Sequence, residues 1–337
     1  GGPEGAVEWD PLPAPPIPKD EGPFEVGGCQ EIDGKYYLVG GWFNYMGHTG
    51  YGTYTLVGDS PVGPFRPDPV AYRLCGNSTR WVALWARFCR TPQELLVTNS
   101  YMYSGYSYES GETWLPPLKR AEVDRGGHLR LAYWQGNSAA KGSEVCIDPA
   151  GCLQVYPVAD EPIPSANGSG SLCIEAGQER PSWLRVDVAS KVVLLNNTFD
   201  LRQGIVLEGK VRATCRDARL ASPAVGLYLE EKDSEGTAIL LESHGMTRIG
   251  KLTIADGFIF DCEDVITSIC ASPAGIAPNV LHTFRLLVRG NMFELYLDDL
   301  LVQTFNTTHA PGTPGKVPRR IGFIVQNGQG HFEAIRA

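Results

Sequence analysis

From Phe24 onward, hydrophobic and polar residues alternate in short runs that end at Gly, Asn, Asp or His residues. A period of two is typical of a β-strand, and turn residues at short intervals favour a propeller, a sandwich or a barrel. No run shows the period of about 3.6 residues that marks an amphipathic helix. The pattern therefore predicts an all-β protein.

The runs before about residue 138 are short and rich in aromatic residues, as in KYYLVGGWF and YGTYTLVGD. Asp33-Gly34 is a dipeptide typical of a two-residue hairpin turn. The segment SYESGETW, residues 107–114, nearly matches the Asp-box, a structural turn between the strands of propeller blades, with Glu109 in the place of its Asp. These features predict propeller blades in the first part of the chain.

From Ser182 on, the runs are longer and alternate more regularly, as in GIVLEGKVRA, AVGLYLEEK and RIGFIVQ. In MFELYLDD, residues 292–299, one predicted strand face carries Phe293, Leu295 and Leu297, and the other carries Glu294 and Tyr296. Such segments predict an antiparallel β-sandwich of the jelly-roll, concanavalin-like type.

The chain of 337 residues is long enough for two domains. Residues 1–22 are rich in Pro and predict an extended linker or surface segment. Residues 23–143 are assigned to the C-terminal blades of a propeller. Residues 144–337 are assigned to the sandwich with its leading connector.

Lys and Arg number 29 and Asp and Glu number 38, so the net charge is -9 and no basic run is long enough to favour nucleic-acid binding. No apolar run approaches the roughly 20 residues that span a bilayer. No phosphate-binding loop, dinucleotide fingerprint or Cys-x-x-Cys pair is present. We therefore expect no cofactor, no metal site, no nucleic-acid partner and no membrane span.

The chain has nine cysteines, an odd number that leaves at least one thiol without a partner in the chain. Cys146 with Cys152 and Cys262 with Cys270 are candidate local disulfides. Asn-x-Ser/Thr sequons occur at Asn77, Asn167, Asn196 and Asn306. Together these features predict a secreted, glycosylated protein.

Three segments together resemble glycoside hydrolase family 32: FEVGGCQEIDGKYYLVGG, TWLPPLKRAEVDRGGHLRLAYWQGN and FRLLVRGNMFELYLDDLLVQTF. The resemblance covers most of the chain from about Phe24 and implies a five-bladed propeller followed by a sandwich. It implies cleavage of β-fructofuranosides with retention of configuration, by an Asp nucleophile on the first blade and a Glu acid/base on the third. Glu25 matches the acid/base, and the nucleophile is expected outside this chain, on a missing N-terminal fragment or a second chain.

The family's Glu-Cys-Pro-Asp motif is matched here only by Glu25, which is followed by Val26, Gly27 and Gly28. Retaining hydrolysis needs two carboxyl groups about 5 Å apart. Two hypotheses therefore stay open. Glu25 is either the acid/base of a hydrolase of fructosides or a related glycan, or a strand-end carboxylate in a non-catalytic carbohydrate-binding or structural glycoprotein.

Trp42, Tyr45 and His48 lie in or next to a Gly- and Asn-containing loop that follows a predicted strand. Aromatic faces suit the apolar C–H face of a sugar ring, so Trp42 and Tyr45 are candidate substrate-binding residues, with core packing as the alternative. His48 is a candidate donor to a substrate hydroxyl, or else a solvent-facing loop histidine.

Overall fold

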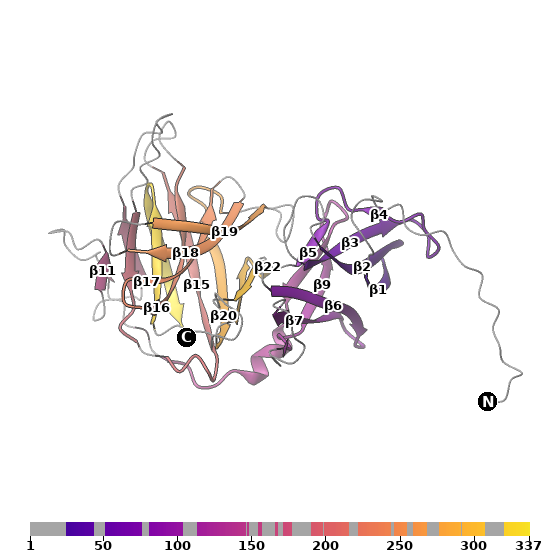
Figure 1. Cartoon of the computed structure of the whole chain (residues 1–337), viewed down its shortest axis with the longest axis horizontal. Helices are drawn as coiled ribbons and strands as arrows, with labels where there is room; N and C mark the ends of the chain where they lie inside the picture. The colour runs from indigo at the N-terminus through magenta and orange to yellow at the C-terminus, as the bar shows by residue number, and fades with distance from the viewer. Residues whose placement is uncertain are drawn as a thin grey trace, which may run out of the picture.

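The computed structural model describes residues 25–43, 51–75, 81–103, 113–145, 147, 154–156, 166–167, 171–176, 190–197, 199–215, 222–243, 246–254, 259–267, 276–290, 292–306 and 320–337. Apart from one short 3-10 helix, η5 (Gln135–Ala140), the elements among these residues are β-strands. The strands form two lobes that lie side by side (Figure 1). The all-β prediction is confirmed.

The first sheet is a five-stranded antiparallel blade in which successive strands are neighbours, as in a propeller. The order is β1-β2-β3-β4, and β5 also pairs with β3. Its strands are β1 (Glu25–Ile32), β2 (Lys35–Phe43), β3 (Tyr51–Gly58), β4 (Arg66–Pro67) and β5 (Arg73–Cys75).

The β1–β2 hairpin turns at Asp33 and Gly34, as the sequence predicts. Both residues have positive φ, 50° and 79°. Two central residues in this region define the type I′ turn, whose twist matches that of the flanking strands. The turn therefore fixes the register in which Ile32 lies opposite Lys35 and Cys29 opposite Leu38.

The second blade stacks on the first. Its strand order is β6-β7-β9-β10, with β8 on the side of β7. Its strands are β6 (Trp81–Arg90), β7 (Leu95–Tyr103), β8 (Thr113–Trp114), β9 (Lys119–Val123) and β10 (Leu129–Tyr133). The core between the blades includes Tyr37 and Val39 of the first and Val97, Leu129 and Leu131 of the second.

Polar contacts also join the blades, beside the turn that connects β9 to β10. The Tyr37 hydroxyl donates to the carbonyl of Gly127 at 2.8 Å. Nδ1 of His128 lies 2.9 Å from the buried Asp68 carboxylate, which also accepts from the backbone amides of Val70 and Ala71. Burial, followed by nearby carboxylates such as Asp68, raises the pKa of Tyr37, so the hydroxyl keeps its proton.

The second lobe is a sandwich of two antiparallel sheets. One sheet has the order β11 (Gln154–Tyr156), β14 (Ser190–Leu194), β23 (Arg320–Gln326), β16 (Ala224–Lys232), β17 (Glu235–Glu242), β18 (Met246–Thr253) and β19 (Ile259–Thr267). The other has the order β12 (Ala166–Asn167), β13 (Ser171–Glu175), β24 (Gln329–Arg336), β15 (Ile205–Thr214), β20 (His282–Arg289), β21 (Met292–Leu297) and β22 (Leu300–Asn306). Side chains such as Leu286, Leu295 and Phe323 fill the core between them, as the alternation predicts.

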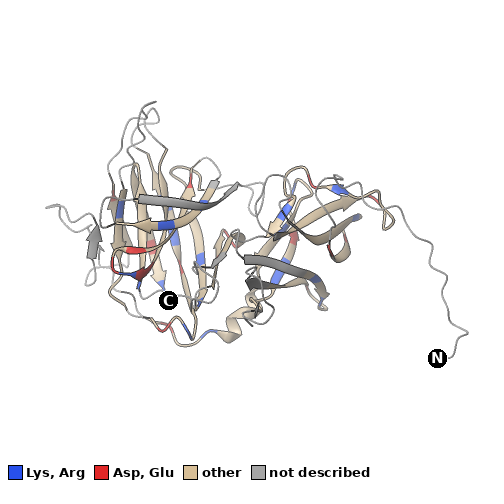
Figure 2. Ribbon diagram, viewed as in Figure 1, with Lys and Arg blue, Asp and Glu red and all other residues tan. Residues whose placement is uncertain are grey.

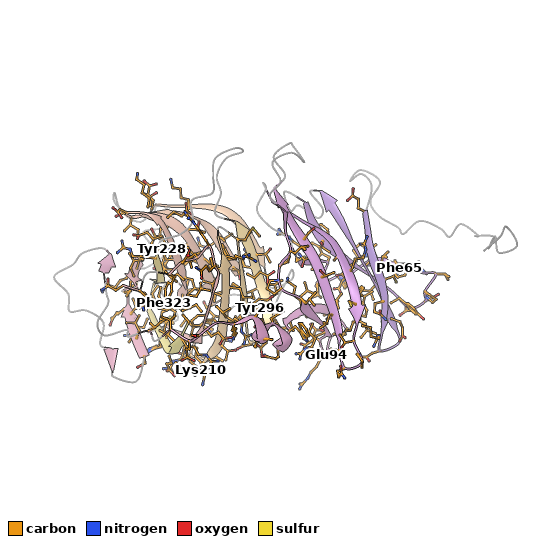
Figure 3. All side chains as sticks on the ribbon, turned by 90° about the horizontal axis from the view of Figure 1, so that it is seen from below. Phe65, Glu94, Lys210, Tyr228, Tyr296 and Phe323 are labelled. Carbon is orange, nitrogen blue, oxygen red and sulfur yellow. The ribbon has the colours of Figure 1, made fainter. Side chains whose placement is uncertain are left out.

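The second sheet of the sandwich continues into the second blade, because β22 pairs with β10 where Leu300 lies opposite Ala132. The backbone amide of Tyr133 also donates to the carbonyl of Asp299 at 2.8 Å. Figure 3 shows Tyr296 where the two lobes meet. The lobes are therefore joined by a shared twelve-stranded sheet.

Strand β21 is buried on both faces. Phe293, Leu295 and Leu297 lie in the sandwich core, while Tyr296 belongs to the core of the blades. Glu294, on the blade side, lies 2.6 Å from Nζ of Lys119, and these side chains are 4% and 0% exposed. Two opposite charges buried at this distance hold β9 of the blade against β21 of the sandwich.

Tyr296 completes this contact by donating its hydroxyl to Glu294 Oε2 at 2.8 Å. Burial, followed by the Glu294 carboxylate, raises the pKa of Tyr296 well above its ordinary value. The Tyr133 ring packs edge-on against Tyr296, with centroids 5.6 Å apart. The buried carboxylate thus has both a cation and a hydroxyl donor.

A second charged cluster ties the connector after η5 to the sandwich. Glu208 accepts from Lys141 at 2.8 Å, from Arg285 at 2.5 Å and from Arg336 at 3.0 Å. The Arg285 guanidinium also lies 3.7 Å from the centroid of the Tyr133 ring of β10. Burial alone would raise the pKa of Glu208, but the bonds from Lys141 and Arg285 outweigh it and lower the pKa to about 2.

Acidic and basic side chains are distributed over both lobes (Figure 2). Among the described residues no helix is long and apolar enough to span a bilayer. Among the described residues, Cys29, Cys75 and Cys89 are free thiols. Both candidate disulfides need cysteines beyond the described residues, and they stay predictions.

Replacing Lys119 by Met leaves the Glu294 carboxylate buried without its cation. We expect the free energy of unfolding to fall by about 3–5 kcal/mol, as when one partner of a buried ion pair is removed. Urea unfolding followed by tryptophan fluorescence measures the loss. The double variant Lys119→Met/Glu294→Met should recover much of the lost stability.

Lys35→Met is the control, because Lys35 forms an exposed ion pair with Asp59. It should lower the free energy of unfolding by at most about 1 kcal/mol. An equally small loss for Lys119→Met would contradict the role of the buried pair.

The pKa of Glu208 predicts a stability that depends on acid pH. Its folded pKa of about 2 lies below the ordinary value of 4.5, so the ionised carboxylate stabilises the folded state above pH 4.5 and loses this effect as the pH falls toward 2. We expect Glu208→Gln to lower Tm at neutral pH and to make Tm less dependent on pH in that window. Calorimetric scans across the window measure both effects. Parallel Tm curves for the wild type and Glu208→Gln would refute this assignment.

Candidate functional site

Glu25, the predicted acid/base, is the first residue of β1, and its side chain is exposed. It lies opposite Gly41 near the end of β2. The next residue pair is Val26 with Gly40, after which the register shifts by a β-bulge before Gly28. A bulge at a strand end re-aims the residues beside it, so it helps to set where the carboxylate points.

Gly27 and Gly28 let β1 lie directly on β6. A Cβ added at Gly27 would lie 2.4 Å from the carbonyl oxygen of Ala86 and 2.8 Å from that of Val39, so no larger residue fits without a backbone shift. Gly28 faces Phe88, two residues further along β6. The two strands therefore run in the same direction, and their N-terminal ends lie on the same side of the blades.

The strand ends on this side of the blades carry aromatic residues. Phe43, the last residue of β2, pairs with Tyr51, the first of β3. Trp81, the first residue of β6, pairs with Tyr103, the last of β7. Together with Glu25 they define the site end, the side of the two blades on which β1 and β6 begin.

The predicted substrate residues are only partly described. Trp42 lies in β2, and its backbone pairs with Gly52 at the site end, so the fold brings it to the same end as Glu25. Its side chain is outside the described part of the structure, as are Tyr45 and His48 entirely. Substrate binding by these three residues stays a prediction.

Glu25 is the sole acidic residue among the described strand ends of the site end, which are residues 25–28, 40–43, 51–54, 81–85 and 100–103. None of these segments contains a second carboxylate. Any second carboxylate of a hydrolytic pair therefore comes from another segment.

The predicted glycosylation residues fall in different settings. Asn196 follows β14, and its side chain is exposed. Asn167 lies in β12 and Asn306 ends β22, and the structure describes their backbones but not their side chains. Asn77 lies outside the described residues.

An open groove of about 950 Å³, the interlobe groove, lies between the lobes. One wall is formed by Leu115, Pro116 and Pro117 together with η5. The other is formed by residues 199–206 and by parts of β20, β21 and the C-terminal end of β24. Sequence reasoning missed this groove because its walls come from segments far apart in the chain. The one local signal is the run Leu115-Pro116-Pro117, which has no place in a strand.

Comparisons with known proteins give a likeness in fold but none in sequence. No protein-family model matches the chain. No curated protein matches it either.

Several solved structures are similar. An exo-inulinase from Aspergillus awamori has 11% sequence identity and a TM-score of 0.48, over 94% of this chain and 58% of that one. A family 32 β-fructofuranosidase from Bombyx mori has 11% identity and a TM-score of 0.47, over 92% of this chain and 54% of that one. A family 66 carbohydrate-binding module from Bacillus subtilis has 13% identity and a TM-score of 0.34, over 49% of this chain and 94% of that one. This chain thus spans little more than half the length of the two hydrolases.

Proposed function

We propose that this chain is part of a retaining glycoside hydrolase that acts on β-fructofuranosides or a related glycan. Glu25 is its acid/base, and the nucleophile is supplied from outside this chain. The observation that carries the proposal is the position of Glu25. It is an exposed carboxylate at the start of β1, at an end of two stacked blades where the strand termini are aromatic.

An acid/base must reach the leaving oxygen of the sugar and then a water molecule, so it has to be accessible and held in place. Glu25 is exposed, and the strand behind it is fixed by the contact of Gly27 with the backbone of β6. On the neighbouring strand, Gly41 lies opposite Glu25 and Gly40 opposite Val26. These are the properties that a proton donor and acceptor needs.

The reaction also needs a nucleophile about 5 Å from the acid/base. Because the described strand ends of the site end contain no other acid, an N-terminal fragment or a second chain is proposed to supply it. Carbohydrate is the proposed ligand, and no cofactor takes part in this chemistry.

The second candidate function is a non-catalytic carbohydrate-binding or structural glycoprotein. The solitary acid at the site end favours it, as do the residues Val26, Gly27 and Gly28, which replace the rest of the family's acid/base motif. In this case Glu25 is a strand-end carboxylate that does no acid/base chemistry. The two functions differ in turnover and not in sugar binding.

We further propose that the protein is secreted and carries an N-linked glycan. The four sequons support this location, and Asn196 is exposed next to a strand end, where an oligosaccharide can be attached without unfolding the sandwich. A glycan at this position would extend from the sandwich into solvent.

Replacing Glu25 by Gln removes the proposed acid/base and keeps its size. We expect kcat/KM of the natural full-length protein on sucrose and inulin to fall by roughly 10²–10⁴, the usual contribution of a positioned acid/base. Glu31→Gln is the matched control, because Glu31 is also exposed on β1 but lies next to the turn at its other end. Steady-state release of fructose measures the effect.

Two outcomes decide between the functions. Equal turnover by Glu25→Gln and wild-type protein removes Glu25 from the mechanism. A wild-type protein that binds these sugars without cleaving them is the non-catalytic protein of the second candidate.

Expression in a secretory eukaryotic host tests the glycan. We expect mass spectrometry before and after enzymatic deglycosylation to show an N-linked glycan at Asn196, and Asn196→Gln to remove it. Asn137→Gln is a control, since Asn137 is followed by Ser138 and Ala139 and is therefore not part of an Asn-x-Ser/Thr sequon. An unmodified Asn196 in the secreted protein would contradict the proposal.

A further inference from the structure

His282, the first residue of β20, is a buried histidine whose two ring nitrogens contact different segments of the sandwich. It is 8% exposed and lies opposite Val211 of the sandwich core. Nε2 lies 3.0 Å from the backbone nitrogen of Ala277, and Nδ1 lies 2.6 Å from Oδ2 of Asp298. The ring therefore bridges the segment that precedes β20 and the turn that follows β21.

These two partners define where the ring carries its hydrogen. A backbone N–H can only donate, so Nε2 accepts from Ala277 with its lone pair and carries no hydrogen. The carboxylate of Asp298 accepts, so the hydrogen is on Nδ1. The observed geometry thus needs the neutral imidazole. A second proton would occupy the lone pair of Nε2 and remove the bond from Ala277.

The segment that this bond holds consists of residues 276–281. Among the described residues, two hydrogen bonds from backbone amides tie it to its surroundings. One is the bond from Ala277 to the ring, and the other runs from Asn279 to the carbonyl of Ala213 at 2.8 Å. Ile276, at the start of the segment, is fully buried in the sandwich core. The imidazole is therefore one of a small number of anchors that keep this segment on the sandwich.

The segment is a compact turn. The amide of Val280 donates to the carbonyl of Ala277 at 3.2 Å. Pro278 occupies the second position of this turn, and Asn279 the third, with a φ of 64°. Positive φ at the third position after a proline is typical of a type II turn. Because the turn closes on itself, it can move as a unit when an anchor is lost.

The partner on the other side of the ring belongs to the junction of the lobes. Asp298 and Asp299 join β21 to β22, and Oδ1 of Asp298 also accepts from the amide of Thr283 at 2.8 Å. The carbonyl of Asp299 accepts from the amide of Tyr133 in the blades. A charged imidazole would still donate from Nδ1 to Asp298, in a stronger, charge-assisted bond. The junction therefore stays in place when the ring is protonated.

The other charged side chains of the elements around the ring are turned away from it or already paired. Residues 276–281 contain no charged side chain. On β15, alternation turns the neighbours of the core residue that faces the ring to the other face of the strand, and these neighbours are Lys210 and Arg212. In the turn, Asp299 accepts from Arg285 at 2.6 Å. Among the described residues, the carboxylate bonded to Nδ1 is thus the main charge beside the ring.

We propose that His282 is a proton-sensitive latch for residues 276–281. With a neutral ring the latch is closed, because Ala277 donates to Nε2. When acid adds the second proton, this bond is lost and the segment leaves the sandwich, while the contact between the lobes persists. Imidazole groups change charge between about pH 5 and 8, so we expect release in this range. The latch belongs to the sandwich and works whether or not the chain binds a sugar.

Amide hydrogen exchange of the full chain, followed by NMR, tests the latch. The protection factor compares the exchange of each amide with that of an unstructured peptide at the same pH. We expect the protection factor of Ala277 to fall about tenfold between pH 8 and pH 5, since one hydrogen bond is lost. That of Asn279 should fall with it. The amide of Tyr133 is the internal control and should keep its protection, because the junction does not open.

Two variants separate the proton from the rest of the contact. His282→Gln offers an acceptor in place of Nε2 but takes up no proton, so Ala277 should be equally protected at pH 8 and pH 5. Asp298→Asn removes the charge that favours the protonated ring, so release should move to lower pH by about one unit. His331→Gln is the matched control, because His331 lies on β24 of the same sheet. It should respond to pH as the wild type does.

The position of the ring hydrogen is measured directly by nitrogen NMR of the histidine side chains at pH 8. A hydrogen on Nε2 of His282 would overturn the proposal. So would an unchanged protection of Ala277 between pH 8 and pH 5, or a fall at Ala277 that leaves Asn279 unchanged. A pH response that survives in His282→Gln would also overturn it.

Discussion

The arrangement of this molecule depends on the ion pair between Lys119 and Glu294. Both charges are removed from water, and a buried charge without a partner is far less stable than a paired one. The lobes therefore cannot separate at β21 without exposing or orphaning these groups. The Tyr296 hydroxyl donates a hydrogen bond to the same carboxylate and so helps to fix the orientation of the Glu294 side chain. Because β22 also pairs with β10, the backbone and the side chains enforce one relative placement of blades and sandwich.

This fixed placement is what gives the interlobe groove a defined shape. A groove whose walls belong to two hinged lobes would change its width with every motion, and it would bind a ligand only at the entropic cost of closing it. Here Glu208 anchors Lys141 of the connector, and Arg285 of the sandwich stacks on Tyr133 of the blade. These contacts within the chain thus hold both walls of the groove in place.

The sequence predicts well those features that depend on neighbouring residues. Asp33-Gly34 specifies a type I′ turn by its own backbone preferences, and the alternation over residues 292–299 predicts β21 and the face that enters the sandwich core. The alternation does not predict that Glu294 is also buried, because its partner Lys119 lies on another lobe. The position of Glu25 at the start of a strand can be predicted locally, from the glycines beside it. The interlobe groove cannot be predicted in this way, because its walls come from segments far apart in the chain.

Under the proposed hydrolase function, the residues around the site end limit where the second carboxyl group can come from. The segments that join its strand ends, residues 44–50 and 76–80, contain no Asp or Glu, while residues 104–112 contain Glu109 and Glu112. Glu109, moreover, stands where the Asp-box has its structural acid. Under the proposed hydrolase function, the nucleophile would therefore come from outside this chain, on a segment that approaches β1 from the side not occupied by β6.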